Sequence, residues 1–324
     1  MVSVRFGRFF YSFVLAALAV SVGLLPGCGG GGGGPQVTPT TNPTAPPLAA
    51  GRIAWTSDRD GTFHLYVMNG DGTGQVRLTR NSGVERSPSW SKDGTRLVFS
   101  YSPDGTLANS DIYSVKSDAT GLTRLTNNSV EDNSPVLSPD SQSIVWSQAT
   151  GSSSTAVFIA NSDGSEARQL SESGEYARTP VFDSQNRVVH SSKFVTGANF
   201  RTKYQIVRLE RDGSGRTVLA STTSNLYSPS VSPDGQTLLY GDDSGGDFEI
   251  YSTPTTSFAP KRFPASTPGD SDARWTPDGR IVFSSIRDGN SEIYSANTDG
   301  TSLLRLTSNS TTDRLPAVLT PSTK

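Results

Sequence analysis

Pairs of residues with at least one charged or polar side chain recur at six equivalent places along this chain. Each pair stands immediately before a Ser-Pro dipeptide or a related sequence: Glu85-Arg86, Asp132-Asn133, Ala177-Arg178, Leu226-Tyr227, Asp270-Ser271 and Asp313-Arg314. If such acids and arginines lie together around the mouth of a channel, they can steer and orient a polar peptide or a protein loop. Two carboxylates that face each other could instead act as the acid and the base of a glycosidase. A third interpretation is that these are solvated loop charges that pair with one another.

Other residues with catalytic potential are few. Of the two histidines, His190 aligns with aromatic residues such as Trp55 and is expected to pack, whereas His64 stands at a polar strand start and is expected to be exposed. The chain contains no G-x-S-x-G nucleophile motif and no H-E-x-x-H zinc motif. The Asp-Gly pairs, including those in residues 69–74, lack the later Glu of a calcium loop and are interpreted as turns. We therefore expect no catalytic residue, cofactor or metal.

An internal repeat positions these residues. Similar apolar segments begin at six positions spaced by 43 to 50 residues: Ile53, Leu97, Ile144, Val188, Leu238 and Ile281. A period of this length with four strand-like segments per repeat is typical of propeller blades. Apolar and polar residues alternate within the segments, and Gly, Asp, Ser and Pro bound them, which leaves little room for helices. The sequence predicts an all-β, six-bladed propeller with four-stranded antiparallel blades.

The two ends of the repeat region are complementary. The chain begins its first repeat at the second strand and ends, at residues 313–321, with what reads as an additional first strand. Val318 in that segment aligns with an apolar position of the other repeats, which holds Trp90, Leu137, Phe182, Val231 and Trp275. We expect the C-terminal strand to complete the first blade and close the ring, since closure removes an unpaired edge.

The repeat resembles that of TolB-type propellers, whose consensus segments are close to SPxWSPDG, IAFxSxRDG, xIYxMxxDG and RRLT. The matching segments are SPSWSKDG from Ser87, TSDRDG from Thr56, LYVMNGDG from Leu65 and SSIRDGNSEIYSANTDG from Ser284, and the likeness covers about residues 52–321. The resemblance implies a propeller that binds a peptidoglycan-associated lipoprotein through its channel. TolB proteins also carry an α/β domain before the propeller. Because a linker occupies that place here, we expect a separate repeat lipoprotein.

The first 27 residues are typical of a bacterial signal peptide. Arg5 and Arg8 precede an apolar stretch from Phe9 to Leu25, which is slightly shorter than the roughly 20 residues of a spanning helix. The sequence LPGC at 25–28 resembles a lipobox, which implies that Cys28 is lipidated and becomes the mature N-terminus. Cys28 is the only cysteine, so the chain has no internal disulfide. The alternative is an uncleaved anchor.

Residues 28–51 combine the lipidated cysteine with a Gly-rich and then a Pro- and Thr-rich linker, which we expect to act as a spacer. The propeller is expected at residues 52–321, followed by a short tail at 322–324. Gly29 after Cys28 resembles lipoproteins exported to an outer membrane. We expect attachment through lipid alone, on the periplasmic or extracellular face. Lys and Arg number 28 against 30 Asp and Glu, and no basic patch suggests nucleic acid. We expect a monomeric propeller.

The fourth repeat carries the main insertion, at residues 193–207. Phe200 and Arg201 bring aromatic and cationic character to this segment, which makes it a candidate contact surface. An alternative is a longer hairpin whose aromatic residues fold back onto the blade.

These observations favour a non-catalytic lipoprotein of the cell envelope whose propeller binds or scaffolds a protein or peptide partner. The expected contacts are the six aligned pairs, excluding Ala177 and Leu226, together with Phe200 and Arg201. The alternative is an envelope hydrolase or lyase that acts on polysaccharide or peptide at the channel mouth.

Overall fold

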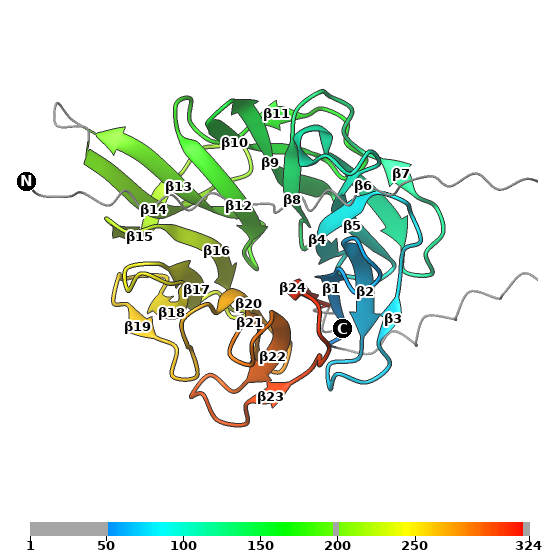
Figure 1. Ribbon diagram of the computed structural model, residues 1–324. Helices are drawn as coiled ribbons and strands as arrows, with labels where there is room; N and C mark the ends of the chain where they lie inside the picture. The colour runs from blue at the N-terminus through cyan, green and yellow to red at the C-terminus, as the bar shows by residue number, and fades with distance from the viewer. Residues whose placement is uncertain (1–50, 197–200, 320–324) are drawn as a thin grey trace, which may run out of the picture. The chain divides into compact units, whose positions relative to one another are not determined.

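The chain folds into a closed ring of six β-sheets, each with four strands (Figure 1). The computed structural model describes residues 51–196 and 201–319. In this part of the chain the only helix is a single 3-10 turn, η1 (Leu107–Asn109). Within the same residues there is no helix long and apolar enough to cross a bilayer. The predicted all-β, six-bladed propeller with antiparallel blades is confirmed. The expected signal peptide, Cys28, most of the linker, Phe200 and the tail lie outside the described residues.

The first three blades run from the closure point through residue 169. Blade one contains β24 (Asp313–Val318), β1 (Ile53–Ser57), β2 (His64–Met68) and β3 (Val76–Arg77). Blade two contains β4 (Val84–Trp90), β5 (Arg96–Ser102), β6 (Asp111–Lys116) and β7 (Thr123–Arg124). Blade three contains β8 (Asp132–Leu137), β9 (Ser143–Gly151), β10 (Ser154–Asn161) and β11 (Arg168–Gln169).

The remaining blades follow in the same order, from the innermost strand outward. Blade four contains β12 (Tyr176–Phe182), β13 (Val188–Thr196), β14 (Arg201–Leu209) and β15 (Thr217–Thr222). Blade five contains β16 (Leu226–Val231), β17 (Thr237–Asp242), β18 (Glu249–Pro254) and β19 (Lys261–Arg262). Blade six contains β20 (Ser271–Trp275), β21 (Ile281–Ser285), β22 (Glu292–Ala296) and β23 (Leu304–Arg305).

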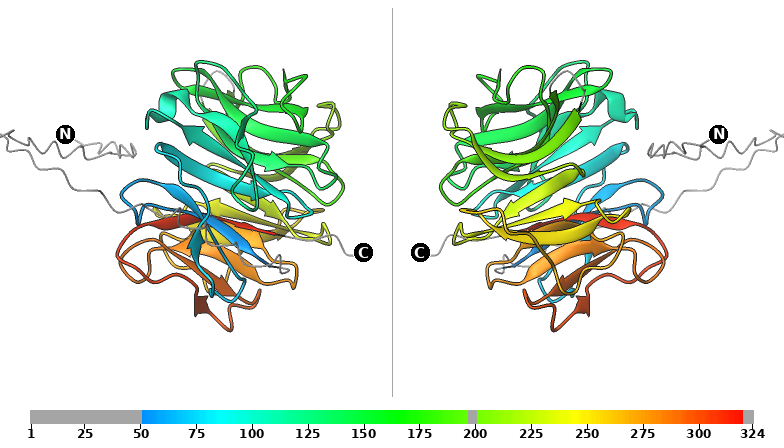
Figure 2. Two further views of the ribbon diagram at one scale, coloured as in Figure 1. Left: turned by 90° about the vertical axis from the view of Figure 1, so that its right-hand side faces the viewer. Right: turned by 90° about the vertical axis from the view of Figure 1, so that its left-hand side faces the viewer.

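The C-terminal strand closes the ring as predicted. β24 pairs antiparallel with β1, and Ile53 lies opposite Val318. The pairing continues past the strand ends, since the amide of Leu319 donates to the carbonyl of Arg52 at 2.8 Å. β24 also contacts β4 of the next blade, so the innermost strands form a continuous inner circle. The side views in Figure 2 show the twisted sheets following one another around this ring.

The hydrophobic core lies between consecutive blades. The second strand of each blade is covered by sheets on both sides, and all five residues of β1 and β21 are buried. His190 on β13 has no exposed surface, which agrees with the prediction that it is a packing residue. The sequence predicted one equivalent apolar position on each innermost strand. Trp90 and Leu137 are buried at this position, and the residues of the other four blades are half-buried: Phe182, Val231, Trp275 and Val318.

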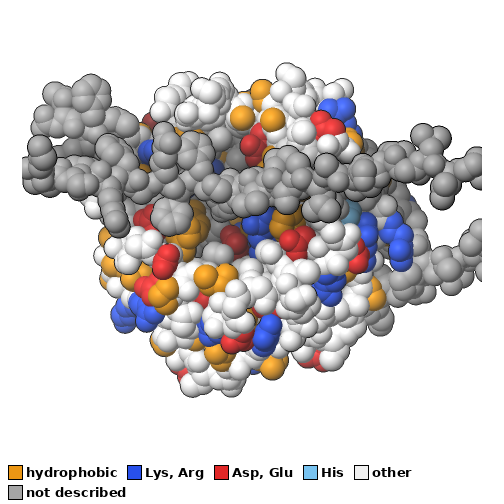
Figure 3. Space-filling view, in the orientation of Figure 1, with side chains coloured by type: hydrophobic (Ala, Val, Ile, Leu, Met, Phe, Trp, Pro, Cys, Tyr) orange, Lys and Arg blue, Asp and Glu red, His pale blue; other side chains and the backbone are white. Residues whose placement is uncertain are grey.

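The Asp-Gly sequences form turns, as predicted. In the turn between β4 and β5, Asp93 accepts hydrogen bonds from the Ser91 hydroxyl at 2.6 Å and the Thr95 amide at 3.0 Å. The carboxylate thereby satisfies turn donors that would otherwise need water. On the surface, basic and acidic side chains are interspersed over the visible face (Figure 3). Where its side chains are visible, that face shows no continuous basic surface of the kind that nucleic acids require.

Candidate functional site

The six predicted pairs lie at the beginnings of the innermost strands, which encircle the centre of the ring (Figure 1). We call this end of the ring the channel mouth. Successive residues of a strand point to opposite sides, and the two members of each pair differ accordingly. The first members have at most 1% of their surface exposed and form the buried row: Glu85, Asp132, Ala177, Leu226, Asp270 and Asp313. The second members are all half-buried and form the inner row: Arg86, Asn133, Arg178, Tyr227, Ser271 and Arg314.

A β-bulge follows the inner row in every blade. In blade two, for example, the register between β4 and β5 shifts between Arg86 and Ser89. The residue that follows the inner row has a positive φ of 49° to 56° although it is never glycine: Ser87, Ser134, Thr179, Ser228, Asp272 and Leu315. Such a conformation costs on the order of 1–3 kcal/mol, and bulges of this kind redirect the neighbouring side chains. The Ser-Pro sequence therefore marks a bend that sets where the inner row points.

The side chains at these bends connect neighbouring blades. The Ser87 hydroxyl of blade two lies 3.1 Å from the Asn133 side-chain oxygen of blade three. The Ser228 hydroxyl of blade five donates to the Asp272 carboxylate of blade six at 2.7 Å. These contacts hold the channel mouth in a defined shape, which favours recognition by preorganised groups.

The carboxylate of Glu85 is part of the packing between the first two blades. It accepts from the Leu65 amide at 3.2 Å and from the Asn81 side-chain amide at 2.6 Å, and the Thr79 hydroxyl also donates to it. Buried carboxylates are stable only when such donors replace water. Glu85 therefore has a structural role.

Asp132 and Asp270 are held in similar ways. Asp132 accepts from the indole nitrogen of Trp146 at 3.1 Å and from Asn128 at 2.7 Å, and burial raises its pKa to about 6. Asp270 pairs with Arg287 at 2.7 Å and accepts from the Thr267 amide at 2.9 Å. Burial also raises the pKa of Asp270, which means that desolvation outweighs the nearby guanidinium.

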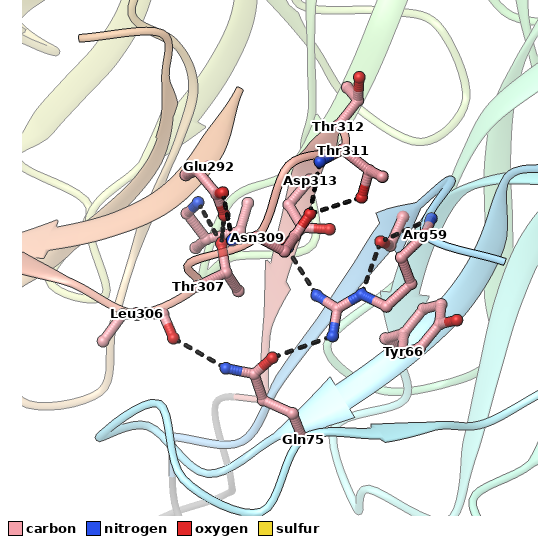
Figure 4. Close-up of polar contacts among 12 residues, drawn as sticks. Arg59, Tyr66, Gln75, Glu292, Leu306, Thr307, Asn309, Thr311, Thr312 and Asp313 are labelled. Atoms are coloured by element: carbon pink, nitrogen blue, oxygen red, sulfur yellow. Dashed lines mark hydrogen bonds and ion pairs between the residues drawn. The ribbon is translucent and has the colours of Figure 1, made fainter. Parts of the chain in front are cut away.

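Asp313 connects the first and the last segments of the propeller. It pairs with Arg59 at 2.7 Å and accepts from Asn309 at 2.8 Å, as Figure 4 shows. Arg59 also donates to Gln75 at 3.1 Å, and Gln75 donates to the carbonyl of Leu306 in blade six at 2.9 Å. This network links blade six to blade one at the point of closure.

The buried row changes the expected charge of the channel mouth. The sequence suggested alternating acids and arginines, but Glu85, Asp132, Asp270 and Asp313 are enclosed and already accept hydrogen bonds. They therefore do not present a negative ring to a partner or a glycosidase pair to a sugar. Among the described residues, no three His, Cys, Asp or Glu side chains form a metal-binding group.

The predicted exposure of His64 is wrong. Only 4% of its surface is exposed, one ring nitrogen lies 2.8 Å from the Thr62 hydroxyl, and the other lies 3.5 Å from the Glu85 carboxylate. The corresponding residues Asp111 and Glu292 are buried as well. These strand starts are covered because residues of the outer strand and the following linker, such as Thr126 and Thr307, reach over them.

Two arginines of the inner row share one aromatic ring. The guanidinium carbon of Arg86 lies 5.0 Å from the centroid of Phe63, and that of Arg314 lies 4.4 Å from the same centroid. Both distances fall within the range of a cation–π contact. The Nε atom of Arg314 is buried and has no hydrogen-bond partner among the described residues. We call Arg86, Phe63 and Arg314 the first cationic cluster.

A second cluster lies in blade four, where the insertion lengthens the central hairpin. The guanidinium carbon of Arg178 lies 5.4 Å from the ring of Tyr176, and the Lys193 ammonium lies 5.9 Å from that ring and 5.8 Å from Tyr204. We call Arg178, Tyr176 and Lys193 the second cationic cluster. Arg201 begins β14, at the far end of this hairpin from the ring. The insertion thus forms an extended hairpin with cations and aromatic rings at its base.

Blades five and six contribute an apolar part of the mouth. Tyr227 packs edge-on against Phe248, with ring centroids 4.2 Å apart. Phe248 is 38% exposed and Ile286 is 51% exposed. Ile286 lies over Gly269, whose amide donates to the Phe248 carbonyl at 2.8 Å, so these apolar residues are neighbours.

Sequence reasoning missed the aromatic partners of the cations, chiefly Phe63, Tyr176 and Phe248. Phe63 and Phe248 each stand just before the third strand of a blade, in loops that vary in length between repeats. Tyr176 stands two residues before Arg178 on β12, so strand alternation would have placed the two on one side.

The sequence matches a known family of propellers. The TolB β-propeller domain family matches residues 40–190 and 88–256. The Tol-Pal system protein TolB of Desulfosudis oleivorans is 41% identical over 61 residues, which are 18% of this chain and 14% of that protein. The match to that relative thus spans about one seventh of its length.

Solved structures share the ring. TolB from Acinetobacter baumannii matches with a TM-score of 0.69 at 18% identity, over 84% of this chain and 67% of that chain. Oligogalacturonate lyase from Vibrio parahaemolyticus matches with a TM-score of 0.51 at 15% identity, over 76% of this chain and 86% of that chain. At such low identities these matches show a common fold, which hosts different functions.

Proposed function

The chain belongs to the TolB β-propeller domain family, and from this premise we propose that it is a non-catalytic protein of the bacterial cell envelope that binds a protein or peptide partner at its channel mouth. The proposal includes removal of residues 1–27, lipidation of Cys28 and a tether formed by residues 28–51. The ring would then be held near a membrane without crossing it.

One observation carries this proposal. The inner row combines three arginines with Asn133, Tyr227 and Ser271 in half-buried positions. The carboxylates beside them belong to the buried row and point to the opposite side of the strands. Interfaces are enriched in arginine and aromatic residues, and the residues that carry most of the binding energy lie in well-packed pockets. The bends after the inner row hold these groups in place, which lowers the entropy lost on binding.

The carboxylates give no comparable support to a hydrolase. A general acid or base must reach the atom with which it exchanges a proton. Glu85, Asp132 and Asp313 are instead fully buried and bound by donors of the blades. A role in binding therefore agrees better with the geometry.

Site-specific photocrosslinking in cells tests the binding site without assuming the partner's charge. A benzophenone side chain at Ser271 lies in the inner row, whereas the same group at Lys92 lies in the turn beyond the other end of an innermost strand. We expect one adduct of defined mass from position 271 and none from position 92. Adducts of equal yield at both positions, or none at position 271, would contradict a binding site at the channel mouth.

A further inference from the structure

The geometry points to a more specific partner, and this inference rests on the proposed function. We propose that the channel mouth recognises an extended acidic peptide segment, whose carboxylates reach the first and the second cationic clusters together. Arg86 and Arg314 around Phe63 would hold one end of the segment. Arg178 and Lys193 around Tyr176 would hold the other.

The first cluster concentrates positive charge on one side of the strands. Arg86 and Arg314 come from different blades, yet both guanidinium carbons lie within 5.0 Å of the Phe63 centroid. The nearest acids in sequence, Glu85 and Asp313, point to the opposite side and are buried. Both guanidinium groups carry a full positive charge at half-buried positions, where a carboxylate that reaches either of them forms a charge-assisted hydrogen bond.

The state of Arg314 supports an anionic ligand. Its buried Nε atom has no hydrogen-bond partner among the described residues, although a buried N–H group normally has one. The guanidinium carbon lies 4.4 Å from the Phe63 centroid, and because Arg314 as a whole is half-buried, part of its side chain stays open to a ligand. A guanidinium group can donate two parallel hydrogen bonds to one carboxylate.

The second cluster lies across the ring from the first. Phe63 and Arg314 belong to blade one and Arg86 to blade two, whereas Arg178 is on β12 of blade four. Of the innermost strands, only β8 separates β4 from β12 on one side of the ring, and β16 and β20 lie on the other side. A ligand that contacts both clusters must span at least the position of the intervening strand β8, which suits an extended peptide better than a compact anion.

The residues between the clusters suit the rest of such a peptide. The inner row contributes Asn133, Tyr227 and Ser271 there. Asn133 donates to the Glu131 carboxylate at 3.2 Å and Ser271 donates to that of Asp272 at 3.1 Å, so the acidic residues of the segment are expected at its ends and polar or apolar residues between them. The exposed rings and side chains of Phe248 and Ile286 offer contacts for an apolar residue. Basic and acidic side chains are interspersed on the visible part of the face in Figure 3, which argues against a long polyanion such as nucleic acid there.

Fluorescence anisotropy with two labelled peptides tests this inference. The acidic probe is a blocked peptide of about twelve residues with two glutamates near each end and leucine and serine between them, and its counterpart has lysines in place of the glutamates. We expect the folded protein to bind the acidic probe and not the lysine probe, and to bind it less tightly as salt increases. Equal binding of both probes, or no binding of the acidic one, would overturn the inference.

Two sets of variants assign the clusters. The first set is the double variant R86Q and R314Q, and the second is R178Q with K193Q. Each should weaken binding of the acidic probe about tenfold. A probe with glutamates at one end only should be sensitive to one set. A matched control also removes two positive charges, at the exposed residues Lys116 and Lys261 away from the mouth, and should bind like the unaltered protein.

The outcomes separate the two proposals. If the acidic probe binds equally to all variants while the crosslink at position 271 persists, the mouth binds a partner through other groups and the acidic segment is wrong. If the crosslink is absent as well, the proposed function fails with it. Circular dichroism of each variant identifies any loss of folding, which has to be checked because glutamine is shorter than arginine or lysine and also removes the contact with the aromatic ring.

Discussion

Arg59 on the loop after β1 pairs with Asp313, the residue with which β24 begins, at 2.7 Å. The same arginine donates to the Ser57 hydroxyl at 2.9 Å and lies 4.7 Å from the ring of Tyr66. Blade six repeats the arrangement, since Arg287 pairs with Asp270 at 2.7 Å and donates to Ser285 at 2.7 Å. The arginine of the S-x-R-D-G sequence is therefore a structural residue that fixes the start of an innermost strand.

Replacing Arg59 by alanine should destabilise the ring by about 3–5 kcal/mol, because the fully buried Asp313 would lose its charged partner. Arg211 provides a matched control, since it pairs with Asp140 at 2.8 Å while both side chains are about one third exposed. Its replacement by alanine should cost about 0–1 kcal/mol. Urea unfolding followed by tryptophan fluorescence measures both, and equal losses would contradict the role assigned to Arg59.

Removing residues 313–324 should destabilise the whole ring, because β1 would lose its pairing with β24 and blade one would expose an edge. A shorter deletion, of residues 320–324, leaves β24 in place and serves as the control. Thermal unfolding followed by circular dichroism should show a lower midpoint or no cooperative transition for the longer deletion only. Identical midpoints for the two deletions would show that closure contributes nothing to stability.

Much of the fold could be predicted from the sequence because each blade repeats the same local pattern. The turns at Asp-Gly, the buried second strands and the closing strand all follow from alternation and from the number of strand types. The bulge with positive φ at Ser87 could not be predicted in this way. Serine is an unusual residue for that conformation, and only the shift in register between β4 and β5 reveals it.

The sequence placed the six pairs at the starts of the innermost strands, but it did not show which member of each pair is enclosed. Two adjacent residues of a strand must point to opposite sides, yet alternation alone does not say which side is enclosed. A signal was present, since Ala177 and Leu226 occupy the same row as Glu85, and apolar residues in a row indicate burial. Cation–aromatic contacts such as Arg314 with Phe63 join distant segments, and no local pattern predicts them.

Asp132 should make stability depend on pH. Burial raises its pKa from 3.8 to about 6, so the folded protein binds more protons than the unfolded chain between these values. Stability from this group is therefore greatest at low pH and is lost as pH rises through about 6, by roughly 2–3 kcal/mol at about 1.4 kcal/mol per pKa unit. Relative to D132N, the unaltered protein should lose stability between pH 4.5 and 7 in urea unfolding. Parallel pH profiles would show that Asp132 titrates normally.

Replacing Cys28 by alanine should release the protein from membranes, because the thiol is the proposed site of lipid attachment and the chain has no other cysteine. Fractionation of cells followed by immunoblotting distinguishes the membrane pellet from the soluble fraction. A serine at Gly29 leaves the cysteine in place and should keep the protein in the pellet. A C28A variant that still sediments after an alkaline wash would contradict lipid anchoring.

Replacing Gly241 by alanine should weaken partner binding without altering any charge. Gly241 on β17 lies opposite Tyr227, and a Cβ atom there would come within 2.8 Å of the Tyr227 ring. Since backbone pairing fixes position 241, the ring must move, and its edge-on contact with Phe248 at 4.2 Å must change with it. G246A is a useful control, because its own positive φ of 99° makes the substitution strained although nothing lies within 4 Å. If crosslinking from position 271 falls in G241A but not in G246A, at matched stability, then Tyr227 and Phe248 belong to the binding surface; equal crosslinking in both would remove them from it.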